Sequence, residues 1–282
     1  MFFKLRKRKQ LRRKGIQATP ATGFTREFKD FRHYTPSDDY RAIDWRLYAR
    51  LKRLYIRLYE EVQEFHLHVV IDTSGSMAEP YGEKRQAVQK LAVALAYLGL
   101  VSQHRVTLYT MGDRMVNSLP PLKGQGNIQK VVEYVQGIEF GGRTDLEACF
   151  REFRPSRQRF GIIFVLSDLF GSEIGSAQQA LRLTNSWPGE SHLIHVFHPR
   201  ERKPELEGEV ELYDVETEEV RRLWFTKREL ARYEAAFQAF SDDLQRGCVL
   251  RQIDYLPWST DEAFEDMFIS LLSKGSVLAG KG

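Results

Sequence analysis

The stretch VVIDTSGSM, residues 69–77, decides the fold of this 282-residue chain. Three apolar residues lead into Asp72, and the hydroxyl side chains of Ser74 and Ser76 follow with a glycine between them. An apolar run that stops at a carboxylate and then turns at a glycine is typical of a buried strand that opens into a loop. In open α/β sheets, loops at the carboxyl ends of the strands form the binding sites. The stretch therefore predicts a sheet strand that ends in a polar binding loop.

Outside this stretch, apolar runs bounded by turn residues alternate with segments of helical periodicity. The apolar runs predict strands and the periodic segments predict helices. Together they predict an α/β fold with a doubly wound, mostly parallel sheet and helices on both faces. We expect strands at 65–72, 105–112, 114–119, 161–168, 192–198 and 247–255, and helices at 82–103, 126–137, 145–153, 175–186, 226–246 and 261–274.

Composition divides the chain into three segments. Residues 66–282 are expected to form the α/β domain, with a β-hairpin insertion at about 205–225 that follows a charged surface loop. Residues 16–65 are rich in aromatic side chains and arginine, and we expect them to pack on that domain. Residues 1–15 are expected to be a basic, flexible arm.

The basic charge of the chain is concentrated in that arm. Residues 1–15 hold eight of the 42 Lys and Arg residues and no acidic residue, which leaves 34 basic against 38 acidic residues elsewhere. A basic arm of this kind could bind weakly to an anionic surface, either lipid or nucleic acid. A solvated terminus without a partner is the interpretation that we favour.

The sequence also predicts the compartment. Two cysteines are too few for a disulfide scaffold and fit a reducing environment. The most apolar long run, residues 91–101, is shorter than the roughly 20 residues that span a bilayer, and no secretory signal is visible at the N-terminus. We expect a soluble, cytoplasmic protein without an integral membrane segment.

Two further polar loops are expected near Asp72. Asp168 follows the apolar run FVLS, and Thr144 follows a glycine pair in FGGRTDL, residues 140–146. If their strands are neighbours, the three loops bring together two carboxylates and three hydroxyls, the oxygen ligands that Mg²⁺ prefers. Each residue taken alone has a simpler explanation as a helix cap or a turn residue.

The pattern D-x-S-x-S, a Gly-rich loop with Thr, and an Asp after a second apolar strand resembles the metal-ion-dependent adhesion site of von Willebrand factor A domains. By that resemblance Asp72, Ser74, Ser76 and Thr144 would be metal ligands, and Asp168 a direct or water-mediated ligand. The resemblance implies Mg²⁺ or Mn²⁺ as the ion, and a partner protein often completes the coordination shell.

The aromatic segment before the domain has its own signals. Residues 38–51 show helical periodicity, and residues 54–62 alternate as a strand does. Arg41 and Asp44 are three residues apart, which would let them pair on one helix face. Trp45 is expected to bury a large area and to brace the segment against the domain, with a partner-binding surface as the alternative.

This segment also resembles the signature that precedes a von Willebrand A-type domain in the domain-of-unknown-function 58 (DUF58) family. Ser37 departs from the family pattern, which has glycine there. The resemblance extends over about residues 23–256 and implies a partnership with a MoxR-type AAA+ ATPase in protein maturation or in metal or cofactor insertion. The matching signature residues are Phe28, Arg32, Tyr34, Asp38 or Asp39, Arg41, Ile43, Asp44, Trp45, Ala49 and Arg50.

We therefore expect a non-enzymatic, metal-dependent adaptor or co-chaperone module. One alternative is a metal-dependent hydrolase, which would need a general base near the ion, and His104 is the candidate. The other alternative is a membrane-surface or nucleic-acid-surface protein that binds through residues 1–15.

Overall fold

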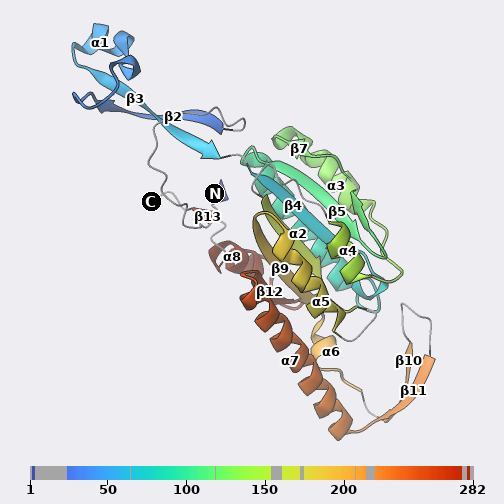
Figure 1. Ribbon diagram of the computed structural model, residues 1–282. Coiled ribbons are helices and arrows are strands. Elements are labelled where there is room, and N and C mark those ends of the chain that lie inside the picture. Colours follow the sequence, from blue (N-terminus) through green and yellow to red (C-terminus); the bar gives the residue numbers. More distant parts are fainter. Residues whose placement is uncertain are drawn as a thin grey trace. The chain divides into compact units, whose positions relative to one another are not determined.

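The computed structural model describes residues 2–3, 24–63, 65–117, 119–153, 161–171, 175–206, 208–213, 220–274 and 278–279. The contacts divide the chain into two compact units, Leu11–Glu64 and a larger unit of Met1–Gln10 with Phe65–Gly282. The larger unit contains the α/β domain, and the smaller one contains the aromatic segment (Figure 1). Among the helices of the described residues, none is long and apolar enough to cross a membrane.

A seven-stranded sheet forms the centre of the larger unit. Its strand order is β12-β9-β8-β4-β5-β6, and β7 pairs with β5. β12, β9, β8, β4 and β5 run parallel, whereas β6 and β7 run antiparallel to β5. The mostly parallel sheet is thus confirmed. The strands are β4 (His66–Asp72), β5 (Arg105–Met111), β6 (Met115–Asn117), β7 (Leu122–Lys123), β8 (Gly161–Ser167), β9 (Glu190–Phe197) and β12 (Asp254–Ser259).

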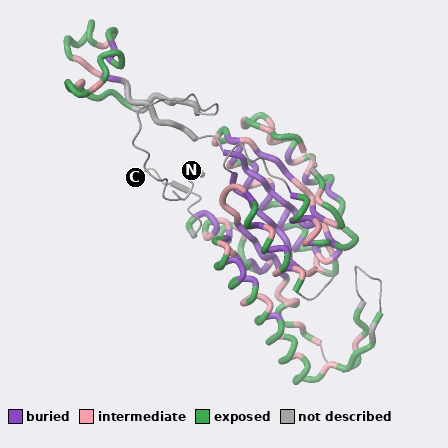
Figure 2. The backbone as a smooth tube through the Cα atoms, in the orientation of Figure 1, coloured by how far each residue is buried: buried purple, intermediate pink, exposed green. Residues whose placement is uncertain are grey.

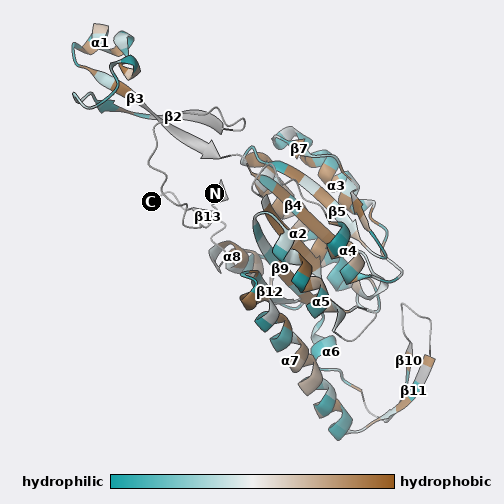
Figure 3. Ribbon diagram, in the orientation of Figure 1, coloured by the Kyte–Doolittle hydropathy of each residue, from teal (hydrophilic) through white to brown (hydrophobic). Residues whose placement is uncertain are grey.

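Helices cover both faces of this sheet, as the alternating pattern predicted. Every residue of β4 and β8 is buried, because both faces of these central strands are covered (Figure 2). Much of the central sheet is brown in Figure 3, the colour of hydrophobic residues. One core contains α2 (Gly82–Val101), α3 (Ile128–Gln136) and α8 (Phe264–Lys274), and the other contains α4 (Leu146–Glu152), α5 (Ser176–Leu183) and α7 (Lys227–Leu250).

The smaller unit is an antiparallel hairpin with a short helix between its strands. β3 (Tyr55–Gln63) lies where the alternation predicted a strand, but its partner β2 (Phe24–His33) was not predicted. The 3₁₀ helix η1 (Tyr40–Ala42) and α1 (Trp45–Leu51) follow the helical pattern, and the side chains of Asp39 and Asp44 cap them. Trp45 is 60% exposed, so the smaller unit itself does not supply the large buried area expected of this residue, and its bracing against the domain stays a prediction.

The predicted hairpin insertion is confirmed, with differences on both sides of it. β10 (Gly208–Tyr213) and β11 (Val220–Phe225) pair antiparallel. The segment after His198, predicted as a charged surface loop, begins instead with the helix α6 (Pro199–Arg202).

The strand predicted at 247–255 is misplaced. α7 continues to Leu250, and β12 begins only at Asp254. Leu244 and Cys248 are buried one helical turn apart, and the apolar residues that suggested a strand include the exposed Val249. Pro257 fits β12 because this strand lies at the edge of the sheet.

Few residues of the predicted basic arm are described. Phe2–Phe3 form β1, which pairs antiparallel with β13 (Leu278–Ala279). The rest of residues 1–15 lies outside the described residues, so its flexibility and its binding to anionic surfaces stay predictions.

Three further 3₁₀ helices complete the elements of the described residues: η2 (Gly75–Met77), η3 (Gln125–Asn127) and η4 (Thr184–Ser186).

Candidate metal site

Asp72 and Asp168 lie at the ends of two neighbouring parallel strands. β4 ends at Asp72, β8 ends one residue before Asp168, and the two strands pair with Ile71 opposite Leu166. β5, the next strand along the chain after β4, lies on the other side of β4, so the strand order reverses between β4 and β8. Ligand sites of open α/β sheets form where the order reverses.

Backbone hydrogen bonds hold the loop after β4 against the loop that carries Thr144. The Gly75 amide donates to the Gly142 carbonyl at 2.9 Å, and the Gly141 amide donates to the Thr73 carbonyl at 2.8 Å. Gly142 has φ +72°, a left-handed conformation that costs least at glycine. The structure thus brings together the two loops that the sequence singled out.

Asp72 is fully buried, and hydrogen bonds surround its carboxylate. Oδ1 accepts a hydrogen bond from the Thr144 hydroxyl at 2.8 Å and one from the Ser74 amide at 3.0 Å. Oδ2 accepts a hydrogen bond from the Ser167 hydroxyl, a residue that the sequence analysis did not single out. Its position directly before Asp168 is the signal that would have identified it.

The hydroxyls of Ser74 and Ser76 lie 3.1 Å apart, after the same strand. Six oxygen ligands at 2.0–2.1 Å in an octahedron place neighbouring ligands about 2.8–3.0 Å apart. The Ser74–Ser76 separation and the 2.8 Å between Thr144 Oγ1 and Asp72 Oδ1 both approach this spacing. Ser74 and Thr144 are buried, and Ser76 is partly exposed at the rim.

Asp168 is also fully buried, and a lysine that the sequence analysis missed pairs with it. Lys84 Nζ lies 3.0 Å from Asp168 Oδ2, and it also contacts Oε1 of Glu201 in α6. The other oxygen of Asp168 accepts a hydrogen bond from the Phe170 amide at 3.2 Å. Between them, Leu169 adopts φ +59°, a rare conformation for an apolar side chain and one that is found at functional sites.

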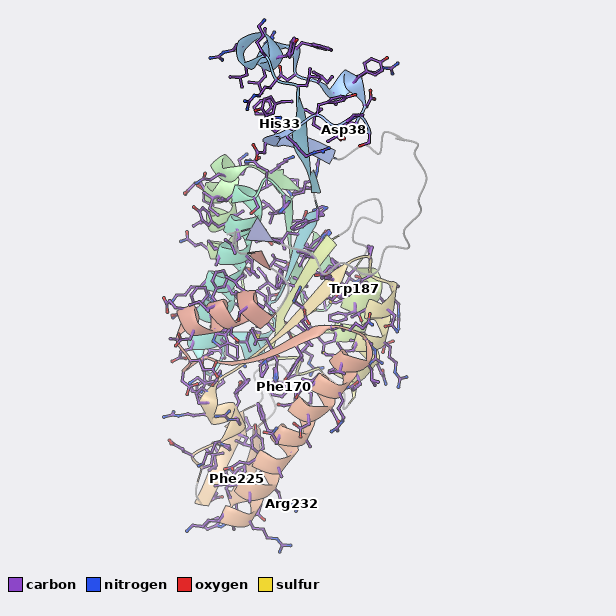
Figure 4. The ribbon with its side chains drawn as sticks, turned by 90° about the vertical axis from the view of Figure 1, so that its left-hand side faces the viewer. His33, Asp38, Phe170, Trp187, Phe225 and Arg232 are labelled. Carbon is purple, nitrogen blue, oxygen red and sulfur yellow. The ribbon has the colours of Figure 1, made fainter. Side chains whose placement is uncertain are left out.

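The loop after Asp168 is anchored on α7. The rings of Phe170 and Phe240 stack with centroids 5.4 Å apart, and Phe170 is labelled in Figure 4. The carboxylate next to Phe170 therefore sits on a packed loop. Such packing favours a fixed ligand geometry.

Burial dominates the electrostatics of the site. Burial, and then the negative charge of Asp168, raise the pKa of Asp72 to about 6, although the hydrogen bonds from Ser167, Ser74 and Thr144 act in the opposite direction. Burial alone would lower the pKa of Lys84, but the charges of Asp168 and Glu201 outweigh it and hold the pKa above its usual value. Lys84 is therefore a cation at neutral pH.

The donor set fits a hard divalent cation. With all groups ionised, Asp72, Asp168, Glu201 and Lys84 carry a net charge of −2. That negative charge attracts a divalent cation, and the side-chain atoms that contact the Asp72 carboxylate are hydroxyl oxygens, which Mg²⁺ accepts as ligands. The described residues contain no group of three or more His, Cys, Asp or Glu side chains that suits a metal ion, so any ion held here would depend on hydroxyl ligands.

Neither His104 nor His195 supplies an accessible base at this site. His104 is buried just before β5 and stacks on Phe65, so it lies at the opposite end of the strands from Asp72. His195 lies nearer to Asp168 but is fully buried, and its Nδ1 pairs with the Tyr255 hydroxyl at 2.7 Å. Burial lowers the pKa of His195 to about 4.

The strand order and the helices on both faces of the sheet define a doubly wound α/β domain, the fold class that the sequence predicted. The chain belongs to the DUF58 family, "Protein of unknown function DUF58", whose model matches residues 30–242. An uncharacterized protein of Mycobacterium tuberculosis is 26% identical over 227 residues, which cover 77% of this chain and 70% of that protein.

Two of the solved structures that match the chain cover about three quarters of it. The conserved hypothetical protein BatB from Bacteroides thetaiotaomicron has a TM-score of 0.42 and 14% identity, over 75% of this chain and 100% of that one. The vWF domain of the pilus tip protein Mfa5 from Porphyromonas gingivalis has a TM-score of 0.42 and 12% identity, over 78% of this chain and 98% of that one.

Proposed function

We propose that this protein is a non-enzymatic protein-interaction module whose partner binding depends on Mg²⁺ or Mn²⁺. Asp72, Ser74, Ser76 and Thr144 would hold the ion, with Asp168 as a direct or water-mediated ligand. The observation that carries this proposal is a pair of oxygen–oxygen distances close to those between metal ligands: 2.8 Å from the Thr144 hydroxyl to Asp72 Oδ1, and 3.1 Å between the Ser74 and Ser76 hydroxyls in the adjoining loop. The ion supplies a site for an additional oxygen ligand, and the partner would provide it as a carboxylate.

The ligand chemistry supports recognition in place of catalysis. Hydroxyl ligands are neutral, so Ser74, Ser76 and Thr144 would offset none of the positive charge of the ion. A carboxylate from a partner is then a favourable addition to the shell. A hydrolase would need a general base near the ion, and His104 lies at the other end of the strands.

Exposed apolar side chains on the β10–β11 hairpin support a protein partner. Among the described residues, β10 and β11 pair only with each other, and an isolated two-stranded hairpin is marginally stable. Leu212 and Leu223 are exposed on one face of this hairpin, and Trp224, on the other face, is 66% exposed. Exposed apolar groups of this kind mark interaction sites. Figure 4 labels Phe225 at the end of β11.

The hairpin is connected to the site through the chain. β9 runs parallel to β8, so its carboxyl end lies at the same edge as Asp168, and α6 begins two residues after that end. The hairpin follows α6 after five residues, 203–207. We therefore expect a partner that offers a carboxylate to the ion to contact the hairpin as well.

The partner we propose is a MoxR-type AAA+ ATPase, which the family resemblance implies. The module would then act as an adaptor or co-chaperone in protein maturation or in metal or cofactor insertion. The compartment we propose is the cytoplasm, where the free cysteines Cys149 and Cys248 would stay reduced.

Affinity capture from a lysate of the source organism, in Mg²⁺ and again in chelator, tests this proposal. The recovered ATPase is then purified, and its affinity is measured for the wild-type protein and for Asp72→Asn. We expect binding in Mg²⁺ that chelator or Asp72→Asn weakens at least tenfold, with circular dichroism showing that the variant is folded. Equal affinity in both conditions would remove the metal from the mechanism, and phosphoester turnover abolished in Asp168→Ala would favour the hydrolase.

A further inference from the structure

Lys84 is an unusual residue for its position. It lies in the first turn of α2, and its side chain is completely buried. Lysine is almost never fully buried unless it is paired, because taking an ammonium group out of water is costly. Its Nζ contacts carboxylates from two different elements, Asp168 after β8 and Glu201 in α6.

We propose that Lys84 is the resident counter-ion of the candidate metal site and couples that site to α6. Its ammonium group holds Asp168 and Glu201 together, so the two loops keep their arrangement without a divalent ion. This inference deepens the proposed function, because it rests on the same metal site. It does not depend on the identity of the partner or on partner binding.

Glu201 is the link between the lysine and α6. Its Oε1 contacts Lys84, and its Oε2 accepts a hydrogen bond from the His198 amide at 2.8 Å, which caps the helix. A second contact joins the same two elements, because the rings of Tyr81 and His198 stack with centroids 3.9 Å apart and an interplanar angle of 13°. The beginnings of α2 and α6 are thus connected by an ion pair and by a ring stack.

The coupling follows from the position of the ammonium group. Asp168 Oδ2 already accepts a hydrogen bond from Lys84, so a divalent cation bound at Asp168 would lie close to a second positive charge. Two cations repel each other strongly in a buried site. Ion binding is therefore expected to weaken the contact between Lys84 and Asp168 and to move the ammonium group of Lys84 toward Glu201. Glu201 lies in α6, which precedes the β10–β11 hairpin.

Melting temperatures in chelator test the counter-ion role. Lys84→Met leaves the buried Asp168 and the mostly buried Glu201 without their positively charged partner, and we expect it to lower the melting temperature by roughly 10 °C. Lys90→Met, an exposed lysine of the same helix, is the control and should change little. The triple variant Lys84→Met/Asp168→Asn/Glu201→Gln removes all three charges and should recover most of the loss. If Lys84→Met has the melting temperature of the wild-type protein, or if the triple variant is no more stable than Lys84→Met, Lys84 contributes only by packing and not as a counter-ion.

Magnesium tests the coupling. We expect 10 mM Mg²⁺ to raise the melting temperature of Lys84→Met by more than it raises that of the wild-type protein, because the ion replaces the missing positive charge in the variant. If Lys84→Met does not fold, Glu201→Gln is the milder test. In chelator this variant should lower the melting temperature by less than Lys84→Met is expected to, and its Mg²⁺ affinity should differ from that of the wild-type protein. Equal gains in Lys84→Met and wild type, or an unchanged affinity in Glu201→Gln, would refute the coupling. The melting temperatures in chelator do not depend on partner binding. If partner binding proved independent of Mg²⁺, the proposed function would fail, but the counter-ion role of Lys84 could still be confirmed.

Discussion

The hydroxyl of Thr144 donates a hydrogen bond of 2.8 Å to Oδ1 of Asp72, across 72 residues of sequence. Both side chains are buried, so the bond joins two loops at the base of the site. If a cation occupied this position, the same two oxygens would be neighbouring ligands at nearly the same separation. The loops would then need little rearrangement to bind an ion.

Removal of the Thr144 hydroxyl should weaken metal binding without disturbing the fold. Thr144→Val keeps the shape of the side chain but loses one oxygen, and we expect the affinity for Mn²⁺ to fall about 10- to 100-fold. Thr144→Ser, which keeps the hydroxyl, should stay close to the wild type. Isothermal titration calorimetry with Mn²⁺ measures both. Equal affinities for the two variants would exclude Thr144 as a ligand.

Metal affinity should depend on pH through Asp72. Burial raises the pKa of this carboxyl to about 6, so below that pH a proton must leave before the carboxylate can help to hold an ion. We expect the apparent Mn²⁺ affinity to be flat above pH 7 and to fall by up to tenfold per pH unit below pH 6. Electron paramagnetic resonance of free Mn²⁺ between pH 5 and 8 gives the profile. In Asp72→Asn the affinity should be low and nearly independent of pH, and a wild-type profile flat down to pH 5 would contradict the assignment.

Sequence predicted the central strands and the three polar loops because their signals are local. β8 is an almost continuous apolar run, β4 ends in the apolar run 69–71, and short apolar runs bounded by turn residues are typical of buried strands. The D-x-S-x-S spacing likewise lies within one loop. The sequence did not show whether Asp168 lies near Asp72, because that depends on the order of the strands. The pairing of β4 with β8 brings the two ends together.

The parts that sequence missed depend on long-range contacts. In sequence, Lys84 looks like a solvent-facing helix residue, and its partner Glu201 is 117 residues away. β2 carries charges between its aromatic residues, which hid its pairing with β3. The end of α7 resembled a strand because apolar residues continue there although Val249 and Leu250 are exposed. Each of these misses needs the tertiary structure to explain it.

The β10–β11 hairpin should contribute to partner binding. Trp224→Ala removes a large exposed ring, so we expect a change of less than about 0.5 kcal/mol in the free energy of unfolding. Tryptophan is enriched among residues that dominate interfaces, and the loss in binding free energy to the ATPase should exceed about 1 kcal/mol. Ile269→Ala, with a similarly exposed side chain in α8, is the matched control. Biolayer interferometry measures both variants, and equal affinities would place the interface away from the hairpin.

The stability of the domain should fall in mild acid because of His68. This residue of β4 is buried, its Nδ1 pairs with the Tyr109 hydroxyl at 3.1 Å, and its ring stacks on His66. Burial, and then the charge of His66, lower the pKa of His68 to about 3, so the folded protein keeps this ring neutral. The unfolded chain takes up a proton below about pH 6.5. The folded state therefore loses stability as the pH falls from 6.5 toward 3, and this histidine costs nothing above pH 7.

The slope from this one histidine approaches about 1.4 kcal/mol per pH unit. Urea unfolding at pH 7.5, 6.0 and 5.0 measures it, and His68→Gln, which can keep a hydrogen bond to Tyr109, is the comparison. We expect the variant to be less stable than the wild type at pH 7.5 and to lose less stability on going to pH 5.0. His195, whose pKa burial lowers to about 4, contributes a similar slope to both proteins and cancels in the difference. Parallel pH profiles for the two proteins would show that His68 is protonated in the folded state or is not buried there.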